Sequence, residues 1–278
     1  MKGNNMKKSL VLASVVSMAF SPAFAGITSF IPTGLEVGLG MSATSGVNGF
    51  VGYINKDFES FWWKRLGARL DFASTSPIKS IINNALKDAV SDVELGEDGL
   101  RINGSSFESK HVAALIDFYP FGNTWFAGGW RLTGGYVFGN LKMATDLTGE
   151  ISGLPAGKHA FVLDGQKYYY DGNSVTGTAD LKWNFNGPYA GTGFDIGLFG
   201  GFKIYFDAGV VFTSKSAEVG VHVPFKGLYT DGDVPVEGNA MLENIVRTAE
   251  KNAVKEAQDE LDKYKLFPMV KLGFLYRF

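Results

Sequence analysis

The feature of this sequence that most constrains its fold is an alternation of apolar and polar residues that recurs along the chain. It is clearest at the end, in KLGFLYRF, where every second residue from Leu272 to Phe278 is apolar. Successive side chains of a β-strand point to opposite sides, so this pattern predicts a strand with one apolar face. Eight segments alternate in this way, at about residues 33–43, 48–56, 65–75, 109–120, 129–143, 187–198, 202–214 and 266–278.

The connections between these segments differ regularly in length. After a tight first loop, the connections 57–64, 121–128 and 199–201 are short, whereas 76–108, 144–186 and 215–265 are long. Short turns at one end and long loops at the other are typical of a bacterial outer-membrane barrel. A soluble β-sandwich more often spaces its strands evenly. The sequence therefore predicts an all-β protein, an eight-stranded antiparallel transmembrane barrel with three long extracellular loops.

The two faces of the predicted strands differ in charge. One face is apolar in seven of the eight segments and is assigned to lipid. The other face carries ten charged residues, which are Glu36, Arg69, Asp71, Asp117, Arg131, Asp195, Lys203, Asp207, Lys271 and Arg277. In a barrel, apolar side chains face outward and polar ones inward. The phase of the second segment stays open, because Phe50 and Ile54 oppose Val51 and Tyr53.

The N-terminal residues read as an export signal. A basic head with Lys2, Lys7 and Lys8 precedes the apolar run 10–20, and Ala23-Phe24-Ala25 fits a cleavage site. We therefore expect residues 1–25 to be a signal peptide and 26–278 to form one barrel domain. The chain has no cysteine for disulfides and no later apolar run long enough for a membrane helix. It also lacks a basic block, so nucleic acid is not an expected partner.

Aromatic residues support a location in the outer membrane. Trp62, Trp63, Trp125 and Trp130 cluster at two of the short turns, where a barrel would meet the membrane interface. The alternative is that they close the base of a soluble sandwich. The aromatic end of the chain, Phe274, Tyr276 and Phe278, resembles the signal read by the outer-membrane assembly machinery. Outer-membrane lipid and that machinery are therefore expected partners of a chain that is expected to be monomeric.

The ten inward charges allow two interpretations. Five are acidic and five are basic, and eight strands enclose a space just wide enough for side chains to fill. Buried charges must be paired, which favours a network of salt bridges that includes Arg69, Asp71, Asp117 and Arg131. The same residues could instead form a charge ladder that guides a solute.

The long connections contain further regular patterns. Apolar residues recur at helical spacing over 78–90 and 239–264, and Asp164-Gly165 is a hairpin-turn signal between strand formers. We expect these segments to pack as a cap above the barrel, with a partner-binding groove as the alternative. Loop 76–108 has more acidic than basic residues, which would attract small cations.

Four stretches resemble a known family. They are FVLDGQKYYYDG, WNFNGPYAGTGFDIG, FDAGVVFTSKSAEVGV and DELDKYKLFPMVKLGFLYRF, within about residues 128–278. In order and spacing they resemble the small outer-membrane barrels that include the carbapenem-associated protein CarO. The resemblance implies an eight-stranded barrel and passage of small basic amino acids such as ornithine. It transfers no residue role to a position in this chain.

Three classes of function follow. A narrow channel for small solutes such as basic amino acids is the leading hypothesis, and a sealed barrel whose loops bind a partner is the alternative. An enzyme is the least favoured, because His111 lies near Ser109 and Glu108 without the spacing of a triad, and His159 and His222 fall in loops. No histidine pair has metal-ligand spacing, and no phosphate-binding loop is present. No catalytic residue, metal or cofactor is therefore predicted.

Overall fold

The structure, a computed structural model, describes residues 32–90, 94–95, 100–122, 127–149, 158–171 and 177–278. The predicted signal peptide, Trp125 and most acidic side chains of loop 76–108 lie outside the described residues. Among the described helices, none combines the length and apolar character needed to cross a membrane.

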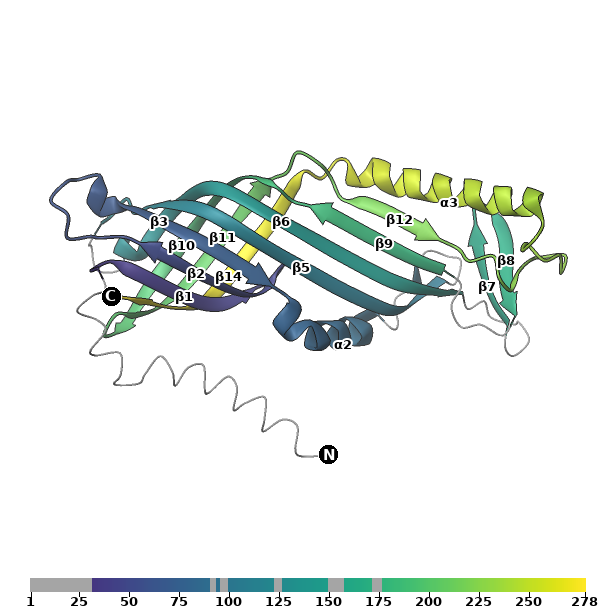
Figure 1. The fold of residues 1–278 in the computed structure, drawn as a ribbon, viewed down its shortest axis with the longest axis horizontal. Helices are drawn as coiled ribbons and strands as arrows, with labels where there is room; N and C mark the ends of the chain where they lie inside the picture. The colour runs from purple at the N-terminus through teal and green to yellow at the C-terminus, as the bar shows by residue number, and fades with distance from the viewer. Residues whose placement is uncertain (1–31, 91–93, 96–99, 123–126, 150–157, 172–176) are drawn as a thin grey trace, which may run out of the picture.

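Eight antiparallel strands close into a barrel (Figure 1). They are β1 (Leu35–Ser42), β2 (Gly46–Tyr53), β3 (Leu66–Ser74), β5 (Leu100–Phe118), β6 (Trp130–Gly149), β10 (Gly187–Phe199), β11 (Phe202–Phe212) and β14 (Leu266–Arg277). Each strand pairs with its neighbours in this order, and β14 pairs with β1. The predicted fold class is confirmed. We call the end with the short connections and the C-terminus the turn end, and the opposite end the loop end.

The last strand closes the barrel. It pairs with β11 over its whole length and with β1 from Glu36↔Arg277 to Ser42↔Lys271. The backbone N–H of Phe278 donates to Leu35 at 2.9 Å, and the carbonyl of Phe278 accepts from Gly34 at 2.9 Å. The apolar end of the chain is thus fixed by hydrogen bonds to the first strand. The alternation of residues in this strand places Leu272, Phe274 and Tyr276 on its outer face, and Lys271 and Arg277 on its inner face.

The outside of the barrel is apolar. Leu70, Ile116 and Phe274 each expose 61% of their surface, although they lie within regular strands. Burying such side chains in lipid removes the hydrophobic cost of this exposure. The sequence left open which residues of the second strand face inward. Phe50 and Ile54 do, since they are 2% and 1% exposed inside the barrel, whereas Val51 faces outward. Strand β2 therefore follows the same rule as the others.

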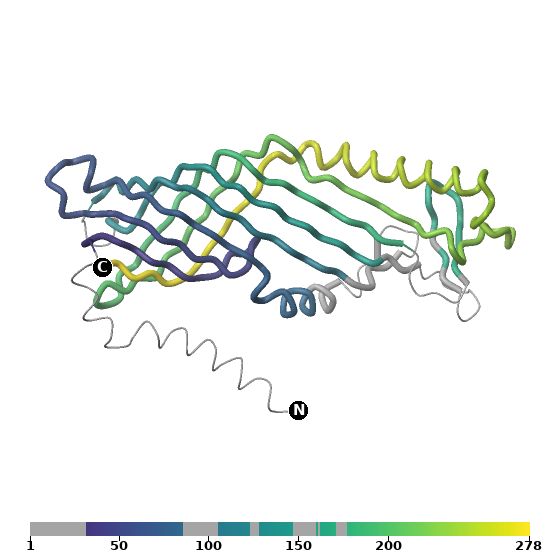
Figure 2. The backbone as a smooth tube through the Cα atoms, viewed as in Figure 1, coloured from purple at the N-terminus to yellow at the C-terminus, as the bar shows by residue number. Residues whose placement is uncertain are grey.

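Two strands are longer than the sequence pattern predicted. Strands β5 and β6 continue past the barrel as a paired ladder from Leu100↔Gly149 onward. Strand β9 (Gly177–Asn184) pairs with the loop-end part of β6, and β12 (Glu218–His222) pairs with β9. Strand β4 (Glu94–Leu95) pairs with β5. The result is a curved wall that extends one side of the barrel at the loop end (Figure 2). Much of the predicted loops 76–108 and 144–186 is thus sheet.

Helix α3 (Ala240–Leu261) covers the edge of this wall. The side chain of Gln258 accepts a hydrogen bond from the backbone of Val219 at 3.3 Å, and that of Glu250 accepts from Val223 at 2.6 Å. These bonds satisfy donors of an otherwise open sheet edge. Helix α2 (Lys79–Val90) packs on the other side of the wall, against β5. The described helices therefore flank the extension, and the expected cap above the barrel mouth is wrong for them.

A small second sheet lies at the far end of α3. It contains β7 (Lys158–Leu163), β8 (Gln166–Asp171) and β13 (Leu228–Thr230). Asp164 and Gly165 form the predicted hairpin turn, with φ angles of 52° and 73°, as a type I′ turn requires. Tyr168, Tyr170 and Leu228 of this sheet pack against Val246 of α3 in a core separate from the barrel. Short 3-10 turns occur at Trp63–Arg65, Ser76–Ile78 and Ala127–Gly129.

Candidate functional site in the barrel interior

Two arginines and three aspartates form the centre of the barrel interior. Arg69 on β3 contacts Asp207 on β11 at 2.7 Å and Asp117 on β5 at 3.0 Å. Arg131 on β6 contacts Asp207 at 2.5 Å, Asp117 at 3.6 Å and Asp195 on β10. All five side chains are at most 5% exposed. We call this the central network, and it joins five strands across the barrel.

The turn end of the interior holds a second group of charges. Arg277 pairs with Glu36 and reaches Asp195 at 3.4 Å, so it is continuous with the central network. The Tyr119 hydroxyl also donates to Asp195, at 3.2 Å. Lys203 faces the same region, but within the described residues it has no carboxylate at salt-bridge distance.

Lys56 lies just beyond β2 and helps to close the turn end. Its ammonium group donates to the carbonyls of Gly122 at 3.2 Å and Gly128 at 2.8 Å. It also sits 4.5 Å from the ring centre of Tyr119. Burial is the main cause that lowers the pKa of Lys56 to about 8, with nearby Arg277 and Lys203 adding to it.

A third group lies nearer the loop end. Lys271 on β14 donates to Asp71 on β3 at 2.6 Å, and His111 on β5 meets the same carboxylate oxygen at 3.0 Å. Asn48 donates to the Tyr205 hydroxyl at 2.9 Å beside them. The His111 ring contacts Asp71, whereas the Ser109 Oγ meets Ser45 Oγ at 3.3 Å. A serine–histidine arrangement for catalysis is therefore not assembled among these residues.

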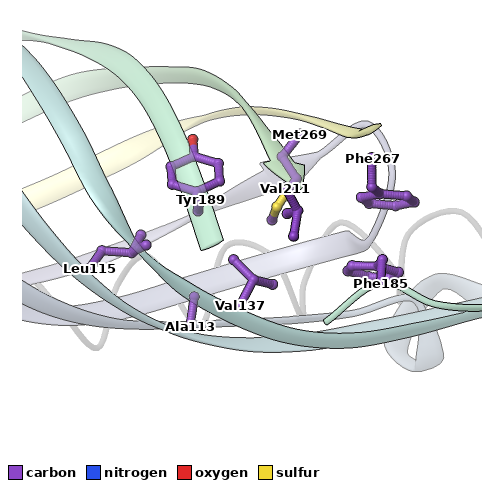
Figure 3. Packing of buried hydrophobic residues seen from close by; sticks show 8 residues of the cluster. All are labelled: Ala113, Leu115, Val137, Phe185, Tyr189, Val211, Phe267 and Met269. Atoms are coloured by element: carbon purple, nitrogen blue, oxygen red, sulfur yellow. The ribbon is translucent and has the colours of Figure 1, made fainter. Parts of the chain in front are cut away.

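The interior nearest the loop end also contains an apolar cluster on one side (Figure 3). Its members are Ala113, Leu115, Val137, Phe185, Tyr189, Val211, Phe267 and Met269. The rings of Phe185 and Phe267 stack with centroids 3.8 Å apart. Gly139 permits this packing, since a Cβ there would lie 2.1 Å from the Phe185 ring. We call these eight residues the apolar layer.

The interior thus brings together nine of the ten charged residues named from the sequence, in ion pairs with one another. Sequence reasoning did not name His111 as a partner of Asp71, nor the apolar layer. The layer could have been found from the inward positions of β10, β11 and β14, which become apolar toward the loop end at Tyr189, Val211 and Met269.

The predicted interface aromatics occupy the turn end where they are described. Trp62 and Trp63 lie in the connection after β2 and are 62% and 64% exposed. Trp130 begins β6 and donates to the Thr192 hydroxyl at 2.8 Å. Among the described residues, no group of three or more His, Cys, Asp or Glu side chains could hold a metal ion.

A cavity of about 630 Å³ lies toward the loop end, and residues from both faces of the strands contribute to its lining, inward Asn48 and Ala73 as well as outward Phe138. It is bounded by β1, β2, β3, β5 and β6, and by Asn184 and Asn186 at the junction of β9 and β10. The apolar layer packs beside it, with members on β5, β6, β10, β11 and β14.

Comparisons with known proteins agree with this fold. No family model matches the sequence, and no curated protein matches it. The crystal structure of Acinetobacter baumannii CarO is similar, with a TM-score of 0.51 over 90% of this chain and 99% of that chain, at 15% identity. CarO2 of the same species has a TM-score of 0.47 at 13% identity, covering 88% of this chain and 99% of that chain. A major outer membrane protein from Thermus thermophilus has a TM-score of 0.38 at 13% identity, covering 88% of this chain and 97% of that chain.

The likeness to CarO confirms the fold that its motifs suggested in the sequence. A closed eight-stranded barrel with an apolar exterior and a charged interior is an outer-membrane β-barrel.

Proposed function

We propose that this protein is a sealed outer-membrane barrel that presents its loop end to the outside as a binding surface. The observation that carries the proposal is the central network. It spans the interior from β3 to β11 with each of its carboxylates and guanidinium groups paired, so that none of these charges is free to accompany a solute. A wide conducting pore would instead keep a wet interior.

The extension at the loop end supports the recognition role. Sealing alone needs only the barrel strands, yet the chain adds a wall of β9 and β12, a helix of 22 residues and a separate three-stranded sheet. These elements have their own packed core around Val246 and Leu228. Ordered surfaces held by a rigid scaffold are well suited to binding. Their partner would approach from outside the cell.

A narrow channel for small basic amino acids is the second candidate. The cavity of about 630 Å³ favours it, because a solute could enter at least this far from the loop end. Conduction past that point would require the central network to open. Phe274, Tyr276 and Phe278 keep their proposed role as an assembly signal in either case, and the protein is proposed to act as a monomer.

Solute flux into liposomes that contain the refolded protein distinguishes the two candidates. Ornithine, lysine and a neutral amino acid of similar size should all enter no faster than into empty liposomes. Heat-resistant migration in a gel would first verify that the barrel has folded.

Saturable or cation-selective flux would contradict the sealed barrel and favour the channel. In that case Asp117→Asn in the central network should reduce the flux, whereas Asp259→Asn on the exposed face of α3 should leave it unchanged. The pair separates a path through the interior from a general effect of charge.

A further inference from the structure

On one side of the barrel, the apolar outer face ends at a definite row of residues toward the loop end. In this row Phe72 on β3 is opposite Val112 on β5, and Val112 is opposite Phe138 on β6. The three side chains are 52%, 57% and 60% exposed, respectively. Outward side chains of this kind contact the lipid chains of a membrane. We call these three residues the last apolar row.

The outer face changes character in the next two rows toward the loop end. The first of them contains Ser74, Lys110, Asn140 and Asn184. The second contains Glu108, Lys142, Lys182 and Glu218. Residues on the same face of a strand are two positions apart, so each step measures about 7 Å along the strand. Lysines therefore begin one step beyond the lipid-facing surface, where the head groups of the lipids lie.

Two of these lysines have no ionic partner. Lys110 and Lys142 are exposed, and neither has a carboxylate at salt-bridge distance within the described residues. Glu108 is opposite Lys142 in the register, but it pairs with Lys79 of α2 at 3.3 Å. The ammonium groups of Lys110 and Lys142 are thus available to an anion from outside the protein.

Neutral hydrogen-bond donors lie beside the two lysines. Asn140 on β6 and Asn184 on β9 are directly opposite each other, and in the described part of the chain neither side-chain amide has a hydrogen-bond partner. Each amide offers N–H donors, and each lysine offers three more. A phosphate group has several strong acceptor oxygens and a negative charge, so it matches this set of donors. The adjacent last apolar row indicates that the ligand is an amphiphile.

The turn end of the barrel has a different boundary. Trp62 and Trp63 are 62% and 64% exposed there, as in the aromatic belts of membrane proteins. The guanidinium group of Arg65 donates to the backbone carbonyls of Pro120 at 3.2 Å and Phe61 at 3.1 Å, so it is already occupied. One rim is therefore aromatic and the other carries unpaired lysines, which suits a membrane whose two leaflets differ in charge.

We propose that Lys110 and Lys142, with the amides of Asn140 and Asn184, bind the phosphorylated sugar head group of an outer-leaflet glycolipid. Its acyl chains lie along the last apolar row, its phosphate meets the two ammonium groups, and its sugar hydroxyls meet the amides. The site lies where the wall of β5, β6 and β9 rises from the barrel (Figure 1). The inference rests on the proposed outward orientation of the loop end, but it requires neither a sealed nor an open barrel.

Native mass spectrometry of the refolded full chain in detergent micelles tests the site. The probes are lipid A, lipid A without its phosphates, and phosphatidylglycerol, and we expect lipid A to bind most tightly. Lys110→Gln and Lys142→Gln should each weaken lipid A binding roughly fivefold, and about thirtyfold together. Lys64→Gln, which removes the same charge at the turn end, is the matched control and should bind as the unmodified protein does.

A conservative double variant separates the charge from a change of fold. Lys110→Arg combined with Lys142→Arg keeps both cations and should retain lipid A binding, and heat-resistant migration verifies that every variant has folded. Equal affinity of the double glutamine variant and the unmodified protein would overturn the site. Equal binding of phosphatidylglycerol and lipid A would overturn the assignment to a glycolipid. Neither result affects the liposome flux experiment, so failure of the lipid site and failure of the sealed barrel remain distinguishable.

Discussion

At the scale of single residues, the interior is governed by the cost of burying charge. Asp207 accepts from two guanidinium groups, at 2.7 Å from Arg69 and 2.5 Å from Arg131, and is 2% exposed. Removing one member of a buried ion pair leaves the partner uncompensated and typically costs about 3–5 kcal/mol. We predict that Asp207→Ala lowers the free energy of unfolding by about this amount. Urea unfolding of the folded protein in micelles measures it.

The matched control for Asp207 is another charge on the same strand. Lys203 also faces inward on β11, but it has no carboxylate partner within salt-bridge distance among the described residues. Lys203→Ala should therefore cost far less than Asp207→Ala. Equal losses in the two variants would show that the central network contributes nothing beyond the removal of one charged side chain.

At the scale of elements, the extension should be separable from the barrel. Val246 is fully buried where α3 meets the three-stranded sheet, whereas its neighbour Ile245 is 42% exposed. A buried unpaired carboxylate is strongly unfavourable. We predict that Val246→Asp releases α3 and speeds proteolysis within Ala240–Leu261 at least tenfold, while the barrel keeps its heat resistance. Ile245→Asp on the same helix should be cleaved at the rate of the unmodified protein.

The opposite outcome would be that Val246→Asp also abolishes heat-resistant migration of the barrel. The extension and the barrel would then fold as one cooperative unit. The hydrogen bonds of Gln258 and Glu250 to the wall would then couple α3 to the membrane strands more strongly than the separate core suggests.

The strands also show which parts of this structure the sequence could predict. Alternation located every barrel strand, because each has an apolar outer face and a different inner one. It could not tell where β5 and β6 leave the membrane, since a wall in water alternates in the same way. Which residues of β2 face inward depends on the adjacent strand β1. Phe50 fits inside because β1 offers Gly38, where a Cβ would lie 2.1 Å from the Phe50 ring.

The interior itself was only partly predictable. Equal numbers of opposite charges in a narrow space predict pairing, but the partners depend on strand stagger. Arg69 and Asp207 are separated by 138 positions along the chain and meet across the barrel. The apolar layer has a similar origin, because Phe185 enters the interior from a junction between two strands where no alternation marks it.

At the scale of the whole molecule, two barriers lie in series along the barrel. The central network crosses the middle, and the apolar layer packs one side nearer the loop end. If the network alone is sufficient to seal, then opening the layer changes nothing. We predict that Phe185→Ala combined with Phe267→Ala leaves single-molecule conductance in planar bilayers at baseline, although it enlarges the cavity.

Conductance should appear only when the network is weakened as well. Adding Asp207→Asn to the two alanine substitutions keeps the side-chain shape but removes one of the two carboxylates that contact both Arg69 and Arg131, the other being Asp117. The guanidinium groups can then separate and admit water, so this triple variant should open intermittently. Asp207→Asn alone weakens the central network while the apolar layer stays intact, and so tests the two barriers in the reverse order. Steady conductance of the double alanine variant would instead assign the seal to the stacked rings of Phe185 and Phe267 and leave the central network as a purely stabilising feature of the barrel.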